Sequence, residues 1–133
     1  MNILAIDHVQ IAMPVGGEEL ARGFYGAALG LEEKPKPPVL AKRGGAWFEQ
    51  GDIKIHLGVE ANFKPAKKAH ACFVVKDLSA MEQKMKHLGF DVTPDSAIAE
   101  VKRFFTADPF GNRIEIMEMS ENLDITSTRL VQN

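Results

Sequence analysis

The sequence has a single cysteine, Cys72, among its 133 residues, so it cannot form an internal disulfide. A lone thiol is compatible with a reducing compartment, and we expect the protein to be cytoplasmic. Long hydrophobic runs are also missing. The N-terminal apolar stretch stops at Asp7-His8 and lacks the basic start of a signal peptide. No stretch approaches the roughly 18 apolar residues of a membrane span, so the sequence predicts no membrane anchor.

An excess of charge of one sign is equally absent. The chain has 16 Lys and Arg against 18 Asp and Glu, which gives a net charge of −2 and a pI of about 6.1. We therefore expect neither nucleic acid nor an anionic membrane surface as a partner. The hydrophobic share of 45% and the charged share of 26% are typical of a soluble globular protein. The length predicts a single domain over residues 1–133.

The most informative feature that is present is an internal repeat of the order strand–helix–strand–strand–strand. The first copy, residues 5–59, comprises a strand at Ala5–Met13, a helix at Glu18–Leu29, a short strand at 31–33 and a hairpin of Ala46–Gln50 with Ile53–Val59. A polar linker spans residues 60–67. The second copy, residues 68–119, comprises a strand at Lys68–Val75, a helix capped by Asp77, a strand at Phe90–Thr93 and a hairpin of Lys102–Ala107 with Arg113–Met119. Residues 120–133 form a C-terminal tail, in which Thr126–Val131 is either an additional strand or disordered.

The repeat places four metal-binding residue types at equivalent positions. His8 and His70 fall on the first strand of each copy, and His56 and Glu115 fall on the last. A carboxylate in the middle of a strand must be solvated, paired or bound to a metal ion. A single strand histidine is usually a hydrogen-bonded structural residue, but three of them with such a carboxylate favour a metal site. The fourth histidine, His87, is expected at the surface, at the end of a helix.

Three stretches carry a resemblance to a known group: Ile6-Asp7-His8-Val9-Gln10-Ile11-Ala12, Phe24-Tyr25 with Leu29-Gly30-Leu31, and Asp108-Pro109-Phe110-Gly111-Asn112-Arg113-Ile114-Glu115. They resemble the vicinal oxygen chelate superfamily. The resemblance implies an α+β fold of two βαβββ modules that form a curved, cup-shaped mixed sheet with helices on the outside. It also implies one divalent metal ion (Zn, Ni, Co, Mn or Fe) with His8, His56, His70 and Glu115 as ligands, and Glu115 as the catalytic base.

Relatives of this kind pair four modules, so the resemblance implies a homodimer, with modules paired within a chain or swapped between chains. A mass of 14.7 kDa by light scattering at micromolar concentration, which is that of one chain, would contradict the dimer.

The implied function is that of a metal-dependent, glyoxalase-like lyase, isomerase or thiol transferase. The glyoxalase pattern commonly has a carboxylate where this chain has His56, so the site would retain about one net positive charge, which favours a small, anionic, metal-chelating substrate. The alternative is a non-catalytic small-molecule binding or sequestering protein of the bleomycin-resistance type.

The candidate substrate-binding residues are Gln10, Trp47, Lys54 and Cys72. Gln10, Lys54 and Cys72 share faces with the proposed ligands, and Trp47 offers a flat ring on which a ligand could stack. Each has a plainer interpretation, such as core packing for Trp47, a solvated position at the rim for Lys54 and an inert buried thiol for Cys72.

Overall fold

The structure is a computed structural model, and it describes residues 1–120. The tail segment Thr126–Val131, expected to be either an additional strand or disordered, lies outside these residues. The chain divides into two compact units. Unit 1 comprises Met1–Lys67 together with Asp108–Asn112, and unit 2 comprises Lys68–Ala107 and, among the described residues, 113–120. Each unit contains one four-stranded mixed sheet, which confirms the predicted α+β fold and its βαβββ repeat. Within residues 1–120, no helix has the length and apolar character needed to cross a membrane.

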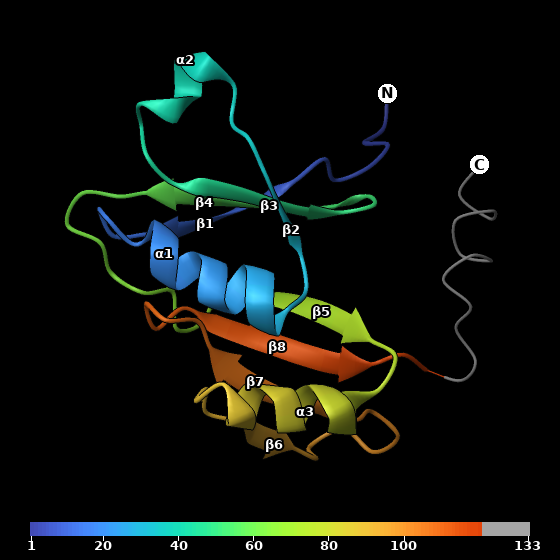
Figure 1. Ribbon diagram of the computed structural model, residues 1–133. Coiled ribbons are helices and arrows are strands. Elements are labelled where there is room, and N and C mark those ends of the chain that lie inside the picture. The colour runs from blue at the N-terminus through green and yellow to red at the C-terminus, as the bar shows by residue number, and fades with distance from the viewer. Residues whose placement is uncertain (121–133) are drawn as a thin grey trace. The chain divides into compact units, whose positions relative to one another are not determined.

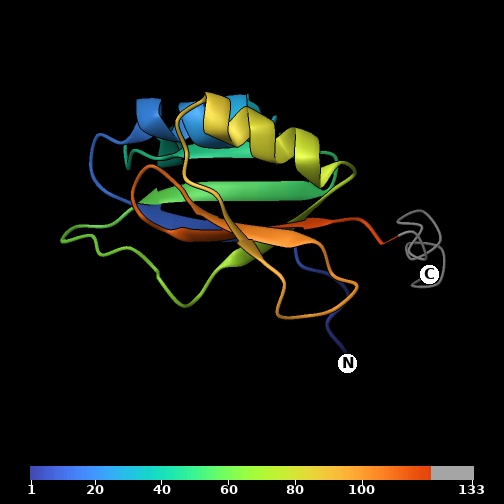
Figure 2. The same ribbon diagram turned by 90° about the horizontal axis from the view of Figure 1, so that it is seen from below.

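Unit 1 builds its sheet in the strand order β1-β4-β3-β2 (Figure 1). Its elements are β1 (Val9–Met13), α1 (Glu18–Ala21), the π-helix η1 (Arg22–Ala28), β2 (Glu32–Lys34), α2 (Pro38–Ala41), β3 (Ala46–Gln50) and β4 (Ile53–Val59). Strand β1 runs parallel to β4, and the other neighbouring strands are antiparallel. Figure 2 shows α1 and η1, in blue, on one side of the green strands, so one face of this sheet is covered by helix.

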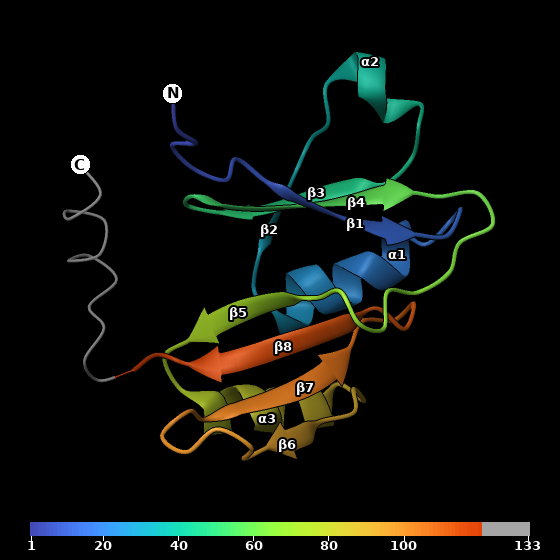
Figure 3. The ribbon, with the colours of Figure 1, turned by 180° about the vertical axis from the view of Figure 1, so that it is seen from behind.

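Unit 2 repeats this topology in the order β5-β8-β7-β6. Its elements are β5 (Ala71–Val75), α3 (Leu78–His87), β6 (Thr93–Asp95), β7 (Arg103–Ala107) and β8 (Arg113–Glu118). Strand β5 is parallel to β8, as β1 is to β4. In Figure 3, α3 lies behind β7, so it too covers only one face of its sheet. The predicted cap of α3 is confirmed, because the Asp77 carboxylate accepts a hydrogen bond of 2.9 Å from the Ala80 N–H.

The first strand of each unit begins later than the sequence predicted. Strand β1 starts at Val9 rather than at residue 5, and β5 starts at Ala71 rather than at residue 68. The reason is pairing: Ala71 is the partner of Ile114, near the start of β8, so earlier residues have almost no neighbouring strand to bond. His8 and His70 therefore immediately precede their strands instead of lying within them.

The helix predicted over Glu18–Leu29 is α-helical only in its first turn. From Arg22 it widens into η1, where the Leu29 N–H donates to the Phe24 carbonyl five residues earlier, at 2.9 Å. Gly23 and Gly26 offer no side chain that would resist this wider turn. The short strands β2 and β6 also begin one and three residues later than the sequence predicted, at Glu32 and Thr93.

Side chains alternate between the two faces of each sheet. One face is buried and forms the core, and the other carries the predicted site residues and is called the functional face below. In unit 1, Phe48, Ile55 and Leu57 are buried, and between them a row formed by Gln10, His56 and Trp47 crosses three strands. In unit 2, Phe104, Ile114 and Ile116 are buried, and the equivalent row is Cys72, Glu115 and Phe105. The repeat thus gives each sheet the same row of side chains opposite its core face.

A buried polar network holds the turn Asp108–Asn112 in unit 1. The Tyr25 hydroxyl donates to Asp108 Oδ2 at 2.7 Å, and Asn112 Nδ2 donates to the same oxygen at 2.9 Å. The backbone N–H groups of Phe110 and Asn112 donate to Asp108 Oδ1, each at 2.9 Å. Asn112 Nδ2 also donates to the Ala12 carbonyl at 2.8 Å, which fixes the turn against β1. Burial, followed by the Asp108 charge, raises the pKa of Tyr25, so its hydroxyl keeps its proton.

Candidate functional site

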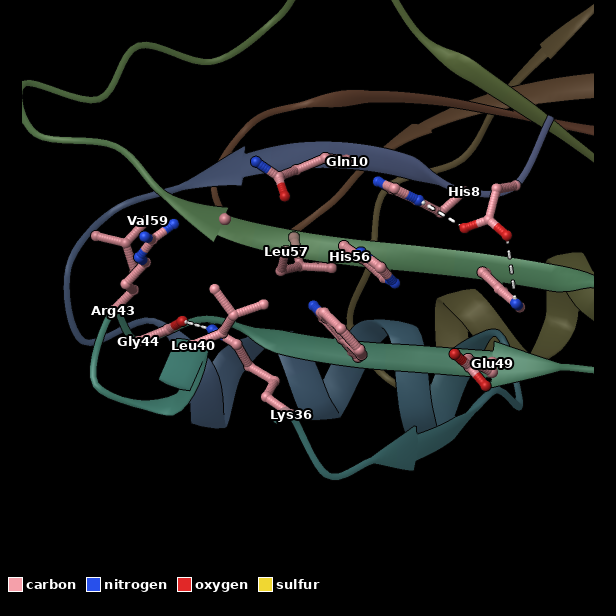
Figure 4. Close-up of a pocket in the computed structure, with 14 residues that line it drawn as sticks. His8, Gln10, Lys36, Leu40, Arg43, Gly44, Glu49, His56, Leu57 and Val59 are labelled. Atoms are coloured by element: carbon pink, nitrogen blue, oxygen red, sulfur yellow. Dashed lines mark hydrogen bonds and ion pairs between the residues drawn. The ribbon is translucent and has the colours of Figure 1, made fainter. Parts of the chain in front are cut away.

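The functional face of unit 1 carries a cavity of about 580 Å³ (Figure 4). Its walls come from the start of β1, from β3 and β4, and from the segment around α2. The cavity brings together five residues that the sequence predicted for the site: His8, Gln10, Trp47, Lys54 and His56. It is also lined by Leu40, Arg43 and Gly44, which sequence reasoning did not assign to the site.

Three aromatic rings form a stack in this cavity. The His56 ring lies 4.2 Å from the His8 ring, at an interplanar angle of 17°, and 4.1 Å from the Trp47 ring, at 6°. His56 is only 7% exposed, and its Nε2 has no hydrogen-bond partner within the described residues. Burial and the neighbouring His8 lower the pKa of His56, so the ring is neutral at pH 7.

The stack has a consequence for metal binding. A histidine nitrogen directs its lone pair in the plane of its ring, and Zn–N bonds are about 2.0–2.1 Å long. Two nearly parallel rings 4.2 Å apart do not direct their lone pairs at one such point. His56 can therefore share an ion with His8 only after its ring turns out of the stack.

His8 is oriented by the residue before it. His8 Nδ1 lies 2.9 Å from Asp7 Oδ2, and Lys54 Nζ lies 3.6 Å from Asp7 Oδ1. The hydrogen bond to His8 and the Lys54 charge lower the pKa of Asp7, which is ionised at pH 7. With Nδ1 donating to a carboxylate, Nε2 carries the free lone pair, which is the usual arrangement of a histidine that ligates a metal.

The functional face of unit 2 contains the closest pair of candidate ligands. His70 Nε2 lies 3.0 Å from Glu115 Oε1, while His70 Nδ1 lies 2.9 Å from the Lys68 carbonyl oxygen. A carbonyl only accepts, so Nδ1 carries a proton, and the lone pair of Nε2 then faces a carboxylate oxygen. Two acceptors at this distance need a cation between them, either a proton or a metal ion.

Glu115 is 5% exposed and its charge is compensated by its neighbours. Burial opposes its ionisation, but the neighbouring His70, Cys72 and Arg103 side chains outweigh that cost and hold the pKa of Glu115 below its usual value. Arg103 Nη1 lies 3.3 Å from Glu115 Oε2, and Arg103 Nη2 lies 3.5 Å from Asp95. The carboxylate that the sequence singled out is therefore paired with an arginine that sequence reasoning missed.

Cys72, the predicted substrate-binding residue of this unit, is exposed overall, while its thiol lies against Glu115. Desolvation of the thiol, and then the neighbouring carboxylate, raise the pKa of Cys72 to about 11. The thiol thus keeps its proton at pH 7 and is a poor nucleophile.

Each unit contributes two of the predicted ligands: His8 and His56 in unit 1, His70 and Glu115 in unit 2. Among residues 1–120, no group of three or more His, Cys, Asp and Glu side chains is arranged to hold a metal ion. The fit of a metal to this chain therefore rests on the orientation of His8 and on the His70–Glu115 pair.

The βαβββ topology agrees with a family of known proteins. The sequence matches the Glyoxalase/Bleomycin resistance protein/Dioxygenase superfamily over residues 5–116. The chain belongs to this superfamily. No curated protein matches the sequence.

Solved structures of the glyoxalase superfamily show the same fold. A protein from Bacillus anthracis assigned to the glyoxalase family is 53% identical, covers 89% of this chain and 97% of its own, and has a TM-score of 0.84. The fosfomycin resistance protein FosX from Listeria monocytogenes is 14% identical, with 90% and 97% coverage and a TM-score of 0.71. Lactoylglutathione lyase from Agrobacterium tumefaciens is 21% identical, with 87% and 94% coverage and a TM-score of 0.65. At these identities, the last two similarities establish the fold alone.

Gln10 can occupy its place in the cavity of unit 1 because Gly58 has no side chain. A Cβ at position 58 would lie 2.6 Å from Gln10 Nε2 and 2.8 Å from its Cδ. We expect Gly58→Ala to displace the Gln10 amide while changing the unfolding free energy by no more than about 1 kcal/mol, because the displaced atoms end a flexible side chain. In ¹⁵N-resolved NMR spectra, the side-chain amide signals of Gln10 should shift.

Gly23→Ala provides the matched control, since a Cβ there meets nothing within 4 Å. It should leave the Gln10 signals in place. Unchanged Gln10 signals in Gly58→Ala would show that the amide does not lie across Gly58 in solution.

Proposed function

We propose that the protein is a divalent-metal-dependent enzyme of the glyoxalase type, acting as a lyase, isomerase or transferase on a small anionic substrate. The observation that carries this proposal is the His70–Glu115 pair, in which a histidine lone pair fixed by the Lys68 carbonyl faces a carboxylate oxygen at 3.0 Å. A proton or a metal ion must lie between these atoms, and imidazole with carboxylate is a ligand set suited to Zn, Ni, Co, Mn or Fe.

The other ligands in this proposal are His8, oriented by Asp7, and His56, whose ring would have to leave its stack. A bound divalent ion would supply a Lewis acid that polarises vicinal oxygen atoms of the substrate. Glu115 would accept the proton that the substrate loses, since its lowered pKa keeps it ionised. Gln10, Trp47 and Lys54 would bind the substrate from the functional face of unit 1.

A second candidate function is supported by Arg103. Its ion pair with Glu115 already neutralises the only proposed anionic ligand and reduces its strength as a base. A non-catalytic protein that binds or sequesters a small molecule in the 580 Å³ cavity would not need that base.

One experiment separates the two functions. The protein is purified without chelators, its metal content is measured by mass spectrometry, and the metal-restored protein is screened for isomerase, lyase and thiol transferase activity. Stoichiometric metal with turnover supports the enzyme. A protein that contains no metal, has no turnover and still binds small anions at micromolar concentration supports the binding protein.

A further inference from the structure

The cavity of unit 1 contains three cationic side chains, and two of them are engaged within it. Lys54 forms an ion pair with Asp7, and Lys36 Nζ donates a hydrogen bond to the Gly44 carbonyl. Arg43 lines the same cavity, and its guanidinium has no ion pair or hydrogen bond with any described residue of the chain. It is therefore the cation in this cavity that is available for a ligand.

The segment that carries Arg43 is held in place at both ends. The Lys36–Gly44 hydrogen bond closes the segment on itself, and Glu18 Oε1 accepts a hydrogen bond of 2.9 Å from the Gly45 N–H. Gly45 has a φ of +85°, and a Cβ there would lie 2.1 Å from the Leu57 carbonyl oxygen, so only glycine lets the chain pass this close to β4. Arg43 therefore belongs to a segment that these contacts fix at the wall of the cavity.

Arg43 and the proposed ligand His8 lie at opposite ends of the cavity. In Figure 4, Arg43 and Gly44 lie near Val59, the last residue of β4, whereas His8 and Glu49 lie toward the start of this strand. Val59 follows Lys54 by five residues along β4, which corresponds to about 17 Å between their backbone positions. Leu40 also lines the cavity, and Trp47, the partner of His56 in the middle of β4, lies between the two ends.

We infer that this cavity selects an elongated dianion, such as a dicarboxylate with an apolar middle, and that Arg43 binds the anionic group remote from the His8 end. The inference rests on the proposed function, in which His8 is among the residues that would hold the metal ion and that ion would bind the first anionic group of the substrate. A guanidinium recognises a carboxylate through two parallel charge-assisted hydrogen bonds. Arg43 would therefore determine specificity for the second charge without taking part in the reaction.

Binding of two probes of equal chain length tests the inference. Suberate has a carboxylate at each end, and octanoate has only one. Trp47 is the sole tryptophan and lines the cavity, so its fluorescence reports binding of either acid. In the zinc-loaded protein at low ionic strength, Arg43→Gln should weaken suberate binding about tenfold and change octanoate binding less than about twofold.

Lys42→Gln is the matched control, because Lys42 is the neighbouring exposed cation and does not line the cavity. It removes the same charge and should leave both affinities within about twofold. The inference is overturned if Arg43→Gln leaves suberate binding unchanged, or if Lys42→Gln weakens it equally.

The inference and the proposed function fail in different ways. A protein that binds no zinc contradicts the metal-dependent function, and the same titrations are then made on the metal-free protein. There, weaker suberate binding in Arg43→Gln than in Lys42→Gln still supports the Arg43 site. Equal binding by the two variants overturns it.

Discussion

Asp108→Ala should destabilise the protein by about 3–5 kcal/mol, the largest stability effect that we expect from a single substitution. The carboxylate is 4% exposed and accepts four hydrogen bonds, from Tyr25, from the Asn112 side chain and from two backbone N–H groups. Alanine would remove the acceptor from all four donors, three of which are buried, and each buried unsatisfied group costs about 1–3 kcal/mol before the structure relaxes. Urea unfolding followed by circular dichroism measures the loss.

Two further variants test whether this loss of stability comes from the hydrogen-bond network of Asp108 or would follow the removal of any aspartate. Tyr25→Phe removes one donor and should cost about 1–2 kcal/mol, because Asp108 keeps its other three partners. Asp91→Ala changes an exposed carboxylate and should have an effect within about 0.5 kcal/mol. A loss below about 1 kcal/mol for Asp108→Ala would show that the buried network does not hold the turn.

Glu115→Gln should lower the affinity for Zn²⁺ about 100-fold or more, the largest binding effect that we expect. The amide keeps the size and shape of the side chain but removes the only anionic group among the proposed ligands. The folded state should persist, since Arg103 retains its ion pair with Asp95 at 3.5 Å. Competition with a chelator of known zinc affinity provides the measurement.

Glu82→Gln is the control for the change in net charge. Glu82 lies on α3, where its carboxylate pairs with Lys86 at 3.0 Å, away from the functional face of the sheet. It should leave the zinc affinity within about twofold. Equal zinc affinities for Glu115→Gln and the unchanged protein would exclude Glu115 as a ligand.

The hairpin strands could be predicted from sequence because their signals are local. Strands β3 and β4 have the predicted bounds, since the turn at Gly51-Asp52 fixes where one ends and the next begins. The start of β1 could not be predicted, because strand pairing rather than composition decides it. The π-helical turn at Arg22–Ala28 also depends on packing, with Phe24, Tyr25 and Ala28 all fully buried.

The candidate site, like the fold, could be predicted from the sequence only in part. The equivalence of His56 and Glu115 follows from the repeat, and the paired rows of Gln10 with His56 and Cys72 with Glu115 agree with it. The stack of His56 between His8 and Trp47 depends on side-chain rotamers and carried no signal in the sequence. Arg103 was missed because its place beside Glu115 depends on the β7–β8 register and on side-chain conformation, which composition alone does not fix.

Zinc-edge X-ray absorption of the zinc-loaded protein tests the proposed metal site most directly. We predict a first shell of nitrogen and oxygen at about 2.0–2.2 Å with the outer scattering of imidazole rings. His70→Ala should reduce that imidazole scattering by one ring, whereas His87→Ala, at the exposed end of α3, should not change it. Failure of the unchanged protein to retain zinc, or identical spectra for His70→Ala and the unchanged protein, would contradict a metal site built on His70 and Glu115.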